Sequence, residues 1–222
     1  GMSLMACGEP EGAAEAFRRA SAVAPGVAEL RVNYGNALFS MGKYSEAERQ
    51  FDAALKIAPG QATASLGKAA AMLKTNRTQE AMTLLGRLQK QMPDSPELKF
   101  NQAIAMYQNG LYPDAAAIFA DYLRMRPDDA EAWNALGVVE LAEKQTQKAK
   151  SSFDRAIGLV SNRGAYYFTR GNAQRDLQKL KDAQDDYTRA AMYTPDMAGI
   201  YLNRGEVRYL LGDKIQACRD LK

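Results

Sequence analysis

Histidine is missing from this chain of 222 residues. Because histidine is the commonest general base and metal ligand, its absence excludes the Ser-His and Cys-His nucleophile arrangements and most familiar hydrolytic chemistry. Acidic pairs remain at Asp128-Asp129 and Asp185-Asp186, but helix capping, solvation and ion pairing account for them. We therefore predict that the chain is not an enzyme and that it holds no cofactor and no metal.

Cysteine is scarce as well, with only Cys7 and Cys218 at opposite ends of the chain. Two cysteines so far apart form neither a zinc-ligand spacing nor a disulfide framework. We expect both to be free thiols. Free thiols are compatible with the cytoplasm, and an upstream signal missing from this sequence would equally allow a bacterial periplasm, so the compartment stays open.

Long apolar runs and blocks of like charge are also absent. No stretch approaches the roughly 20 apolar residues that a membrane-spanning helix needs. Lys and Arg number 29 against 26 Asp and Glu, which leaves a net charge of only +3. Nucleic-acid binding requires a concentrated basic face. We therefore expect neither membrane insertion nor a nucleic-acid partner.

A period of 34 residues organises the sequence that is present. A small residue, a bulky apolar one and a second small one precede most of the residues that mark this period, as in Ala47-Phe51-Ala54 and Ala149-Phe153-Ala156. In two periods a larger residue, Leu88 or Tyr122, replaces the second small one. Spacings of four and three residues place these side chains on one face of a helix, which proline then ends. The marks are five prolines, with Ser161 in the one vacant place: Pro25, Pro59, Pro93, Pro127 and Pro195.

The first half of each period predicts another helix, followed by a short turn. Turns are expected at 41–44, 110–113 and 212–214, where glycine supplies the C-cap and Pro113 suits the first turn of the following helix. Ser45 with Glu48 is interpreted as a capping box. The eighth residue of each period is small and admits close helix contact: Gly35, Ala69, Ala103, Gly137, Gly171 and Gly205.

The pattern Trp133-x-x-Leu136-Gly137 followed by Ala149-x-x-x-Phe153-x-x-Ala156 resembles the tetratricopeptide repeat family, and the other periods do so too. The resemblance implies an all-α fold, a right-handed superhelical solenoid of antiparallel helix hairpins. It covers residues 1–222 as a single array. Five full repeats are expected at 28–61, 62–95, 96–129, 130–163 and 164–197, with partial repeats at 1–27 and 198–222.

What the resemblance implies for function is a protein-protein interaction scaffold, in which the first helices line a concave groove for a peptide or partner protein. The alternative is a targeting or assembly segment of a larger multidomain enzyme or of an envelope or secretion complex. Neither end of the array is a complete repeat, so we expect a fragment of a longer chain or disordered ends. The exposed faces of the terminal repeats would also invite pairing between molecules.

In this family the second, fifth, ninth, twelfth and thirteenth residues of a repeat face the concavity. The corresponding stripe is largely apolar here, which suits an extended or helical peptide. The other reading of any single residue in it is packing against an adjacent first helix. The predicted binding residues are Val32, Asn36, Phe39, Leu66, Leu73, Phe100, Ile104, Tyr107, Asn134, Val138, Leu141, Phe168, Asn172, Arg175, Leu202 and Tyr209.

Some family members grip the C-terminal carboxylate of chaperones with a lysine at the fifth place and asparagines at the ninth and sixth. Asn172 and Asn203 stand at those asparagine places, but Phe168 replaces the lysine. Asn36 stands at the ninth place of the repeat 28–61, but Val32 replaces the lysine at its fifth place. The clamp is therefore not intact.

Two late repeats replace the usual apolar seventh residue by arginine, Arg170 and Arg204, and each carries an aspartate sixteen residues later, Asp186 and Asp220. The other repeats have neither residue at these places. We predict that each arginine crosses to the second helix of its own hairpin and forms a bidentate ion pair. The competing reading, arginines that bind an acidic partner, is disfavoured because each has an acid in register.

Overall fold

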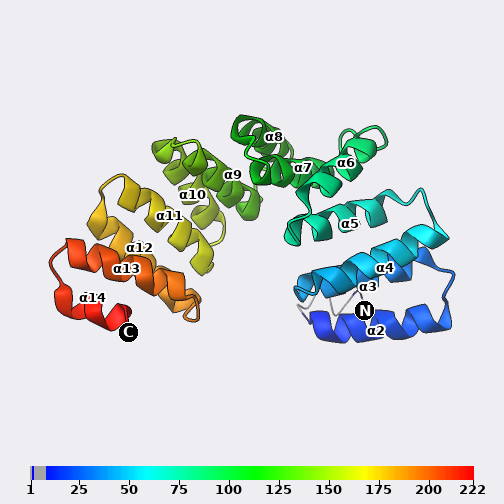
Figure 1. The fold of residues 1–222 in the computed structure, drawn as a ribbon, viewed down its shortest axis with the longest axis horizontal. Coiled ribbons are helices and arrows are strands. Elements are labelled where there is room, and N and C mark those ends of the chain that lie inside the picture. The colour runs from blue at the N-terminus through cyan, green and yellow to red at the C-terminus, as the bar shows by residue number, and fades with distance from the viewer. Residues whose placement is uncertain (1, 3–8) are drawn as a thin grey trace. The chain divides into compact units, whose positions relative to one another are not determined.

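The computed structural model describes residue 2 and residues 9–222, and every regular element in that part of the chain is an α-helix (Figure 1). The fold is an all-α solenoid, as expected. The helices group into two compact units, residues 1–109 and 110–222. The boundary falls between the two helices of the predicted repeat 96–129. Cys7 and most of the first helix of the predicted partial repeat 1–27 lie outside the described residues.

The first unit contains six described helices, and neighbours in the chain pack against each other. The first helices of its predicted repeats, α3, α5 and α7, also contact one another in order. The bounds are α2 Pro10–Val23, α3 Ala28–Ser40, α4 Tyr44–Ile57, α5 Ala62–Lys74, α6 Thr78–Gln89 and α7 Pro96–Gln108.

The second unit follows the same plan, with α11 touching both α9 and α13. Its helices are α8 Tyr112–Met125, α9 Ala130–Ala142, α10 Thr146–Leu159, α11 Gly164–Asp176, α12 Leu180–Tyr193, α13 Ala198–Leu210 and α14 Lys214–Asp220. None of the described helices is long and apolar enough to cross a membrane. Cys218, on α14, is an exposed free thiol.

The turns inside the hairpins confirm the predicted glycine caps. Gly42, Gly110 and Gly212 have φ of 75°, 78° and 90°, a left-handed conformation that glycine adopts without steric cost. The same conformation occurs at the equivalent place in three other hairpins, where Asn76, Lys144 and Gln178 stand. Pro113 lies in the first turn of α8, also as predicted.

The predicted capping box at Ser45 is wrong. Helix α4 begins at Tyr44, its N-cap residue is Lys43, and no side chain accepts a hydrogen bond there. The Ser45 hydroxyl therefore lies inside the first turn rather than before it. Glu48 instead accepts hydrogen bonds from Nη1 of Arg77, with both N–O distances 2.8 Å.

The core of each unit is built on bulky rings that press against small residues of the first helices. Phe51 in α4 is fully buried, and a Cβ placed on Gly35 or Gly67 would lie 2.7 or 2.6 Å from its ring. Phe153 has the same relation to Gly137, at 2.5 Å. Because such distances leave no room for a side chain, glycine is required at these three places for this packing.

This packing predicts that a larger side chain at Gly137 destabilises the fold, whereas one at an open glycine does not. Gly137→Leu should lower the free energy of unfolding by about 2 kcal/mol, because the new side chain overlaps the closely packed Phe153 ring. Gly158→Ala is the matched control, since no atom lies within 4 Å of an added Cβ there. That variant should be neutral or stabilising by up to about 1 kcal/mol, because alanine favours the helix. Urea unfolding measures both, and an equal response would contradict the packing account.

Candidate functional site

The predicted binding residues all lie on first helices, and we call this set the first-helix surface. In the first unit they come from α3, α5 and α7. Two of them are core residues: Val32 is 7% exposed and Leu73 is 2% exposed. Leu66 and Ile104 are half-buried and pack against the core cluster around Leu73. These four side chains therefore contribute at least partly to helix packing.

The remaining members in the first unit are more open. Asn36 is exposed, while Phe39, Phe100 and Tyr107 are half-buried. The Phe39 ring meets Tyr44 edge to face, with ring centroids 5.1 Å apart. This part of the surface thus combines aromatic side chains with one accessible amide.

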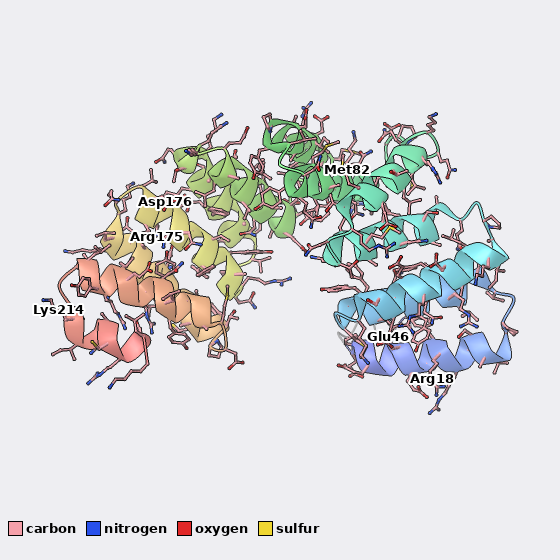
Figure 2. All side chains as sticks on the ribbon, viewed as in Figure 1. Arg18, Glu46, Met82, Arg175, Asp176 and Lys214 are labelled. Carbon is pink, nitrogen blue, oxygen red and sulfur yellow. The ribbon has the colours of Figure 1, made fainter. Side chains whose placement is uncertain are left out.

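In the second unit the surface comes from α9, α11 and α13. Val138 and Leu141 are half-buried against the cluster around Phe153. Leu202 and Tyr209 on α13 are 52% and 60% exposed. Figure 2 shows Arg175 beside Asp176 on α11, and the Arg175 guanidinium lies 3.6 Å from Asp176 and 3.5 Å from Glu206.

Polar members of this surface are joined by hydrogen bonds between helices. The hydroxyl of Thr169 donates to Oδ1 of Asn134 at 2.7 Å. The hydroxyl of Tyr187 and Nδ2 of Asn203 both donate to Oδ1 of Asn172, each at 2.8 Å. Burial raises the pKa of Tyr187 to about 12, so its hydroxyl stays protonated at neutral pH and remains a donor.

Sequence reasoning did not find these partners. The Tyr187 ring lies in the core, while its hydroxyl reaches the first-helix surface. The available signal was the coincidence of a tyrosine, where other repeats have phenylalanine or leucine, with an asparagine in the same repeat. Phe168, another predicted binding residue, packs beside the same ring with centroids 5.9 Å apart.

The two predicted arginine-aspartate pairs are confirmed. Arg170 donates from Nε and Nη2 to the carboxylate of Asp186, both at 2.7 Å. Arg204 donates in the same way to Asp220, at 2.9 and 2.6 Å. The hydrogen bonds with Asp186 are the main cause that raises the pKa of Arg170 above its usual value. These arginines are therefore held internally.

Each pair also has a third member that sequence reasoning missed. Nη1 of Arg170 donates to Asp154 at 2.9 Å, and Nη1 of Arg208 donates to Asp220 at 2.7 Å. Lys68 pairs with Asp52 at 2.6 Å across the same kind of junction between repeats. For Arg170 and Lys68 the signal was an aspartate sixteen residues before a basic seventh residue, which links one repeat to the next. Arg208 instead reaches Asp220 within its own hairpin.

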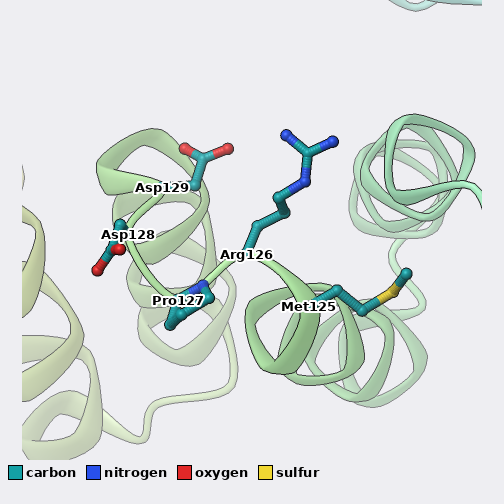
Figure 3. Close-up of a pocket in the computed structure, with 5 residues that line it drawn as sticks. All are labelled: Met125, Arg126, Pro127, Asp128 and Asp129. Carbon is teal, nitrogen blue, oxygen red and sulfur yellow. The ribbon is translucent and has the colours of Figure 1, made fainter.

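A surface depression of about 390 Å³ lies at the loop between α8 and α9 (Figure 3). Asp129, one of its lining residues, caps α9 by accepting from the Ala132 N–H at 3.0 Å and also accepts from the Tyr122 hydroxyl at 2.5 Å. The Asp129 carboxylate therefore stabilises the loop through these two hydrogen bonds. The depression is lined by Met125, Arg126, Pro127, Asp128 and Asp129, which are not predicted binding residues.

Paired helices stacked in a regular array define a helical-hairpin solenoid. Two tetratricopeptide repeat family models match the chain, one over residues 38–105 and the other over 1–62, 100–163 and 168–217. The chain belongs to the tetratricopeptide repeat family. No curated protein sequence matches it. The fold supports a general role as a protein-interaction scaffold, and members of this family are typically non-catalytic.

Solved structures share this fold at low sequence identity. A chain of the APC/C hetero-tetramer Cut9–Hcn1 has a TM-score of 0.88 and 19% identity over 99% of this chain, which spans only 44% of that one. PilF of Pseudomonas aeruginosa has a TM-score of 0.73 and 17% identity, covering 87% of this chain and 88% of its own. A tetratricopeptide repeat protein from Parabacteroides merdae has a TM-score of 0.71 and 19% identity, with coverages of 99% and 87%.

The buried ion pair between Arg170 and Asp186 should contribute to the free energy of unfolding. The Arg170 and Asp186 side chains are only 16% and 4% exposed. Arg170→Ala should therefore lower the free energy of unfolding by about 3 kcal/mol, because it leaves a buried carboxylate unpaired. A double-mutant cycle with Asp186→Ala, followed by urea unfolding, measures the coupling between the two side chains.

The exposed pair Arg124–Asp121, at 79% and 47% exposure, supplies the matched control. Its coupling should be below about 0.5 kcal/mol. Equal coupling energies for the two pairs would show that the buried bidentate geometry carries no special stability.

Proposed function

We propose that the chain is a non-catalytic scaffold that binds a peptide segment of a partner protein on the first-helix surface. The observation that carries the proposal is the contrast between two faces of α13. Ile200 and Val207 on this helix are fully buried, whereas Leu202 and Tyr209 expose 52% and 60% of their surface. Exposed apolar side chains gathered on one face are typical of interaction sites.

The polar groups on the same helices suit a peptide rather than a purely apolar ligand. Asn134 and Asn172 on neighbouring first helices present amides beside Val138 and Phe168. Amides can bond to the main chain of an extended segment while apolar side chains bury its residues. Apolar contact area and main-chain hydrogen bonds together therefore support a polypeptide ligand.

A second candidate is a targeting or assembly segment of a larger protein. The chain matches 44% of a chain in the Cut9–Hcn1 hetero-tetramer, so an array of this kind can be one part of a longer assembly subunit. An immunoblot of source cells, with an antibody raised against this array, separates the candidates. A product much larger than 24.4 kDa supports the second candidate, and a product of that mass removes it.

The scaffold proposal predicts a localised loss of binding. Twelve-residue peptides are selected from a random display library on the wild-type chain, and their dissociation constants are measured by fluorescence anisotropy. Leu202→Asp combined with Tyr209→Asp should weaken binding at least ten-fold, since each change removes roughly 1.5 kcal/mol or more of apolar contact.

The matched control is Met192→Asp combined with Ile215→Asp, on second helices α12 and α14. These side chains are more accessible than Leu202 and Tyr209, at 73% and 72% exposure, but lie off the first-helix surface. We expect their affinity to stay within about two-fold of the wild type because they make no contact with the peptide. Failure to select any peptide, or equal losses in both double variants, would contradict the proposal.

A further inference from the structure

One core residue, Tyr187, differs by a single hydroxyl from the phenylalanines that stand at three equivalent places. Phe51, Phe119 and Phe153 occupy the same place in their second helices as Tyr187, and all four side chains are fully buried. Phenylalanine therefore satisfies the packing requirement at this position. The Tyr187 hydroxyl adds a polar contact that the ring alone does not need.

The hydrogen bond from the Tyr187 hydroxyl determines which hydrogen-bonding groups of Asn172 remain for a ligand. An amide oxygen accepts two hydrogen bonds, and Oδ1 of Asn172 receives one from the Tyr187 hydroxyl and one from Nδ2 of Asn203, each at 2.8 Å. Both acceptor places are filled. Only Nδ2, which carries two N–H groups, remains for a ligand, so Asn172 meets a ligand as a donor.

We propose that Tyr187 is a positioning residue, which holds the amide of Asn172 as a hydrogen-bond donor for an acceptor oxygen of the bound peptide. This inference rests on the proposed function and deepens it by naming the residue that fixes the orientation of Asn172, which stands at an asparagine place where some family members bind a carboxylate. The acceptor is a main-chain carbonyl or a carboxylate. Arg175, three residues further along α11 and on the same side of the helix, carries other N–H donors besides those that face Asp176 and Glu206, at 3.6 and 3.5 Å.

The first unit contains a natural comparison. Asn36 occupies the ninth place of its repeat, as Asn172 does, and is exposed. Its core neighbour is Phe51 and the next repeat offers Gly67, so neither the hydroxyl nor the second amide exists there. Asn36 is therefore an amide in the equivalent position without the two contacts that orient Asn172.

Side-chain ¹⁵N relaxation on the full chain tests the positioning role without any ligand. In the wild type the Asn172 amide should have an order parameter near about 0.85, against below about 0.6 for Asn36. In Tyr187→Phe the Asn172 value should fall towards that of Asn36, while the melting temperature stays within about 4 °C because phenylalanine fits the core. Equal order parameters at Asn172 and Asn36 in the wild type, or no fall in the variant, would overturn the inference.

Small probes test the chemistry of the ligand. N,N-dimethylacetamide, which has a carbonyl but no N–H, represents a peptide carbonyl, acetate a carboxylate, and methylammonium a pure donor. We expect the Asn172 Nδ2 resonances to shift with the first or second probe but not with methylammonium, and to shift less in Tyr187→Phe. A larger shift with the amide probe indicates that the peptide binds through a main-chain carbonyl. A larger shift with acetate indicates that it binds through a carboxylate. A response only to methylammonium, or to no probe, would contradict the donor assignment.

The selected peptides separate this inference from the proposed function. If peptides bind through Leu202 and Tyr209, Tyr187→Phe should weaken them about five-fold, the loss expected when one hydrogen bond is no longer aligned. Unchanged affinity in that variant would overturn the positioning role and leave the scaffold intact. Absence of peptide binding together with an ordered Asn172 amide would instead remove the proposed function.

Discussion

Each unit depends on the contact between a buried ring and the small residues of the first helices. A Cβ on Gly171 would come within 2.8 Å of the Tyr187 ring, and Gly35 and Gly137 stand equally close to Phe51 and Phe153. The ring sits where a larger eighth residue would hold the helices apart. Because one face of α3, α9 and α11 is used for this contact, another face of these helices is left to carry the residues we assign to binding.

The periodic contacts were predictable from sequence because they depend on spacing alone. Small residues four and three places from a bulky one specify a helical face in any repeat, and glycine at the turn specifies a left-handed residue. The Arg170–Asp186 pair was predictable for a related reason. Both residues depart from the repeat pattern together, and each charge needs an opposite partner when it is buried.

The other features required three-dimensional distances. The link from Arg170 to Asp154 crosses a repeat boundary, so a search within one hairpin cannot find it. The burial of Val32 and Leu73 depends on neighbouring helices, since a residue at the border of two helical faces is buried or exposed according to what packs beside it. The start of α4 one residue before Ser45 likewise depends on the turn and not on the serine.

Chemical-shift mapping of the ¹⁵N-labelled chain with a selected peptide tests the central claim, that the first-helix surface binds polypeptide. The account predicts perturbations concentrated on first helices, with the side-chain amide of Asn172 and the backbone amides of Leu202 and Tyr209 among the strongest. Perturbations confined to the second helices, or to the depression lined by Met125 and Asp129, would contradict it.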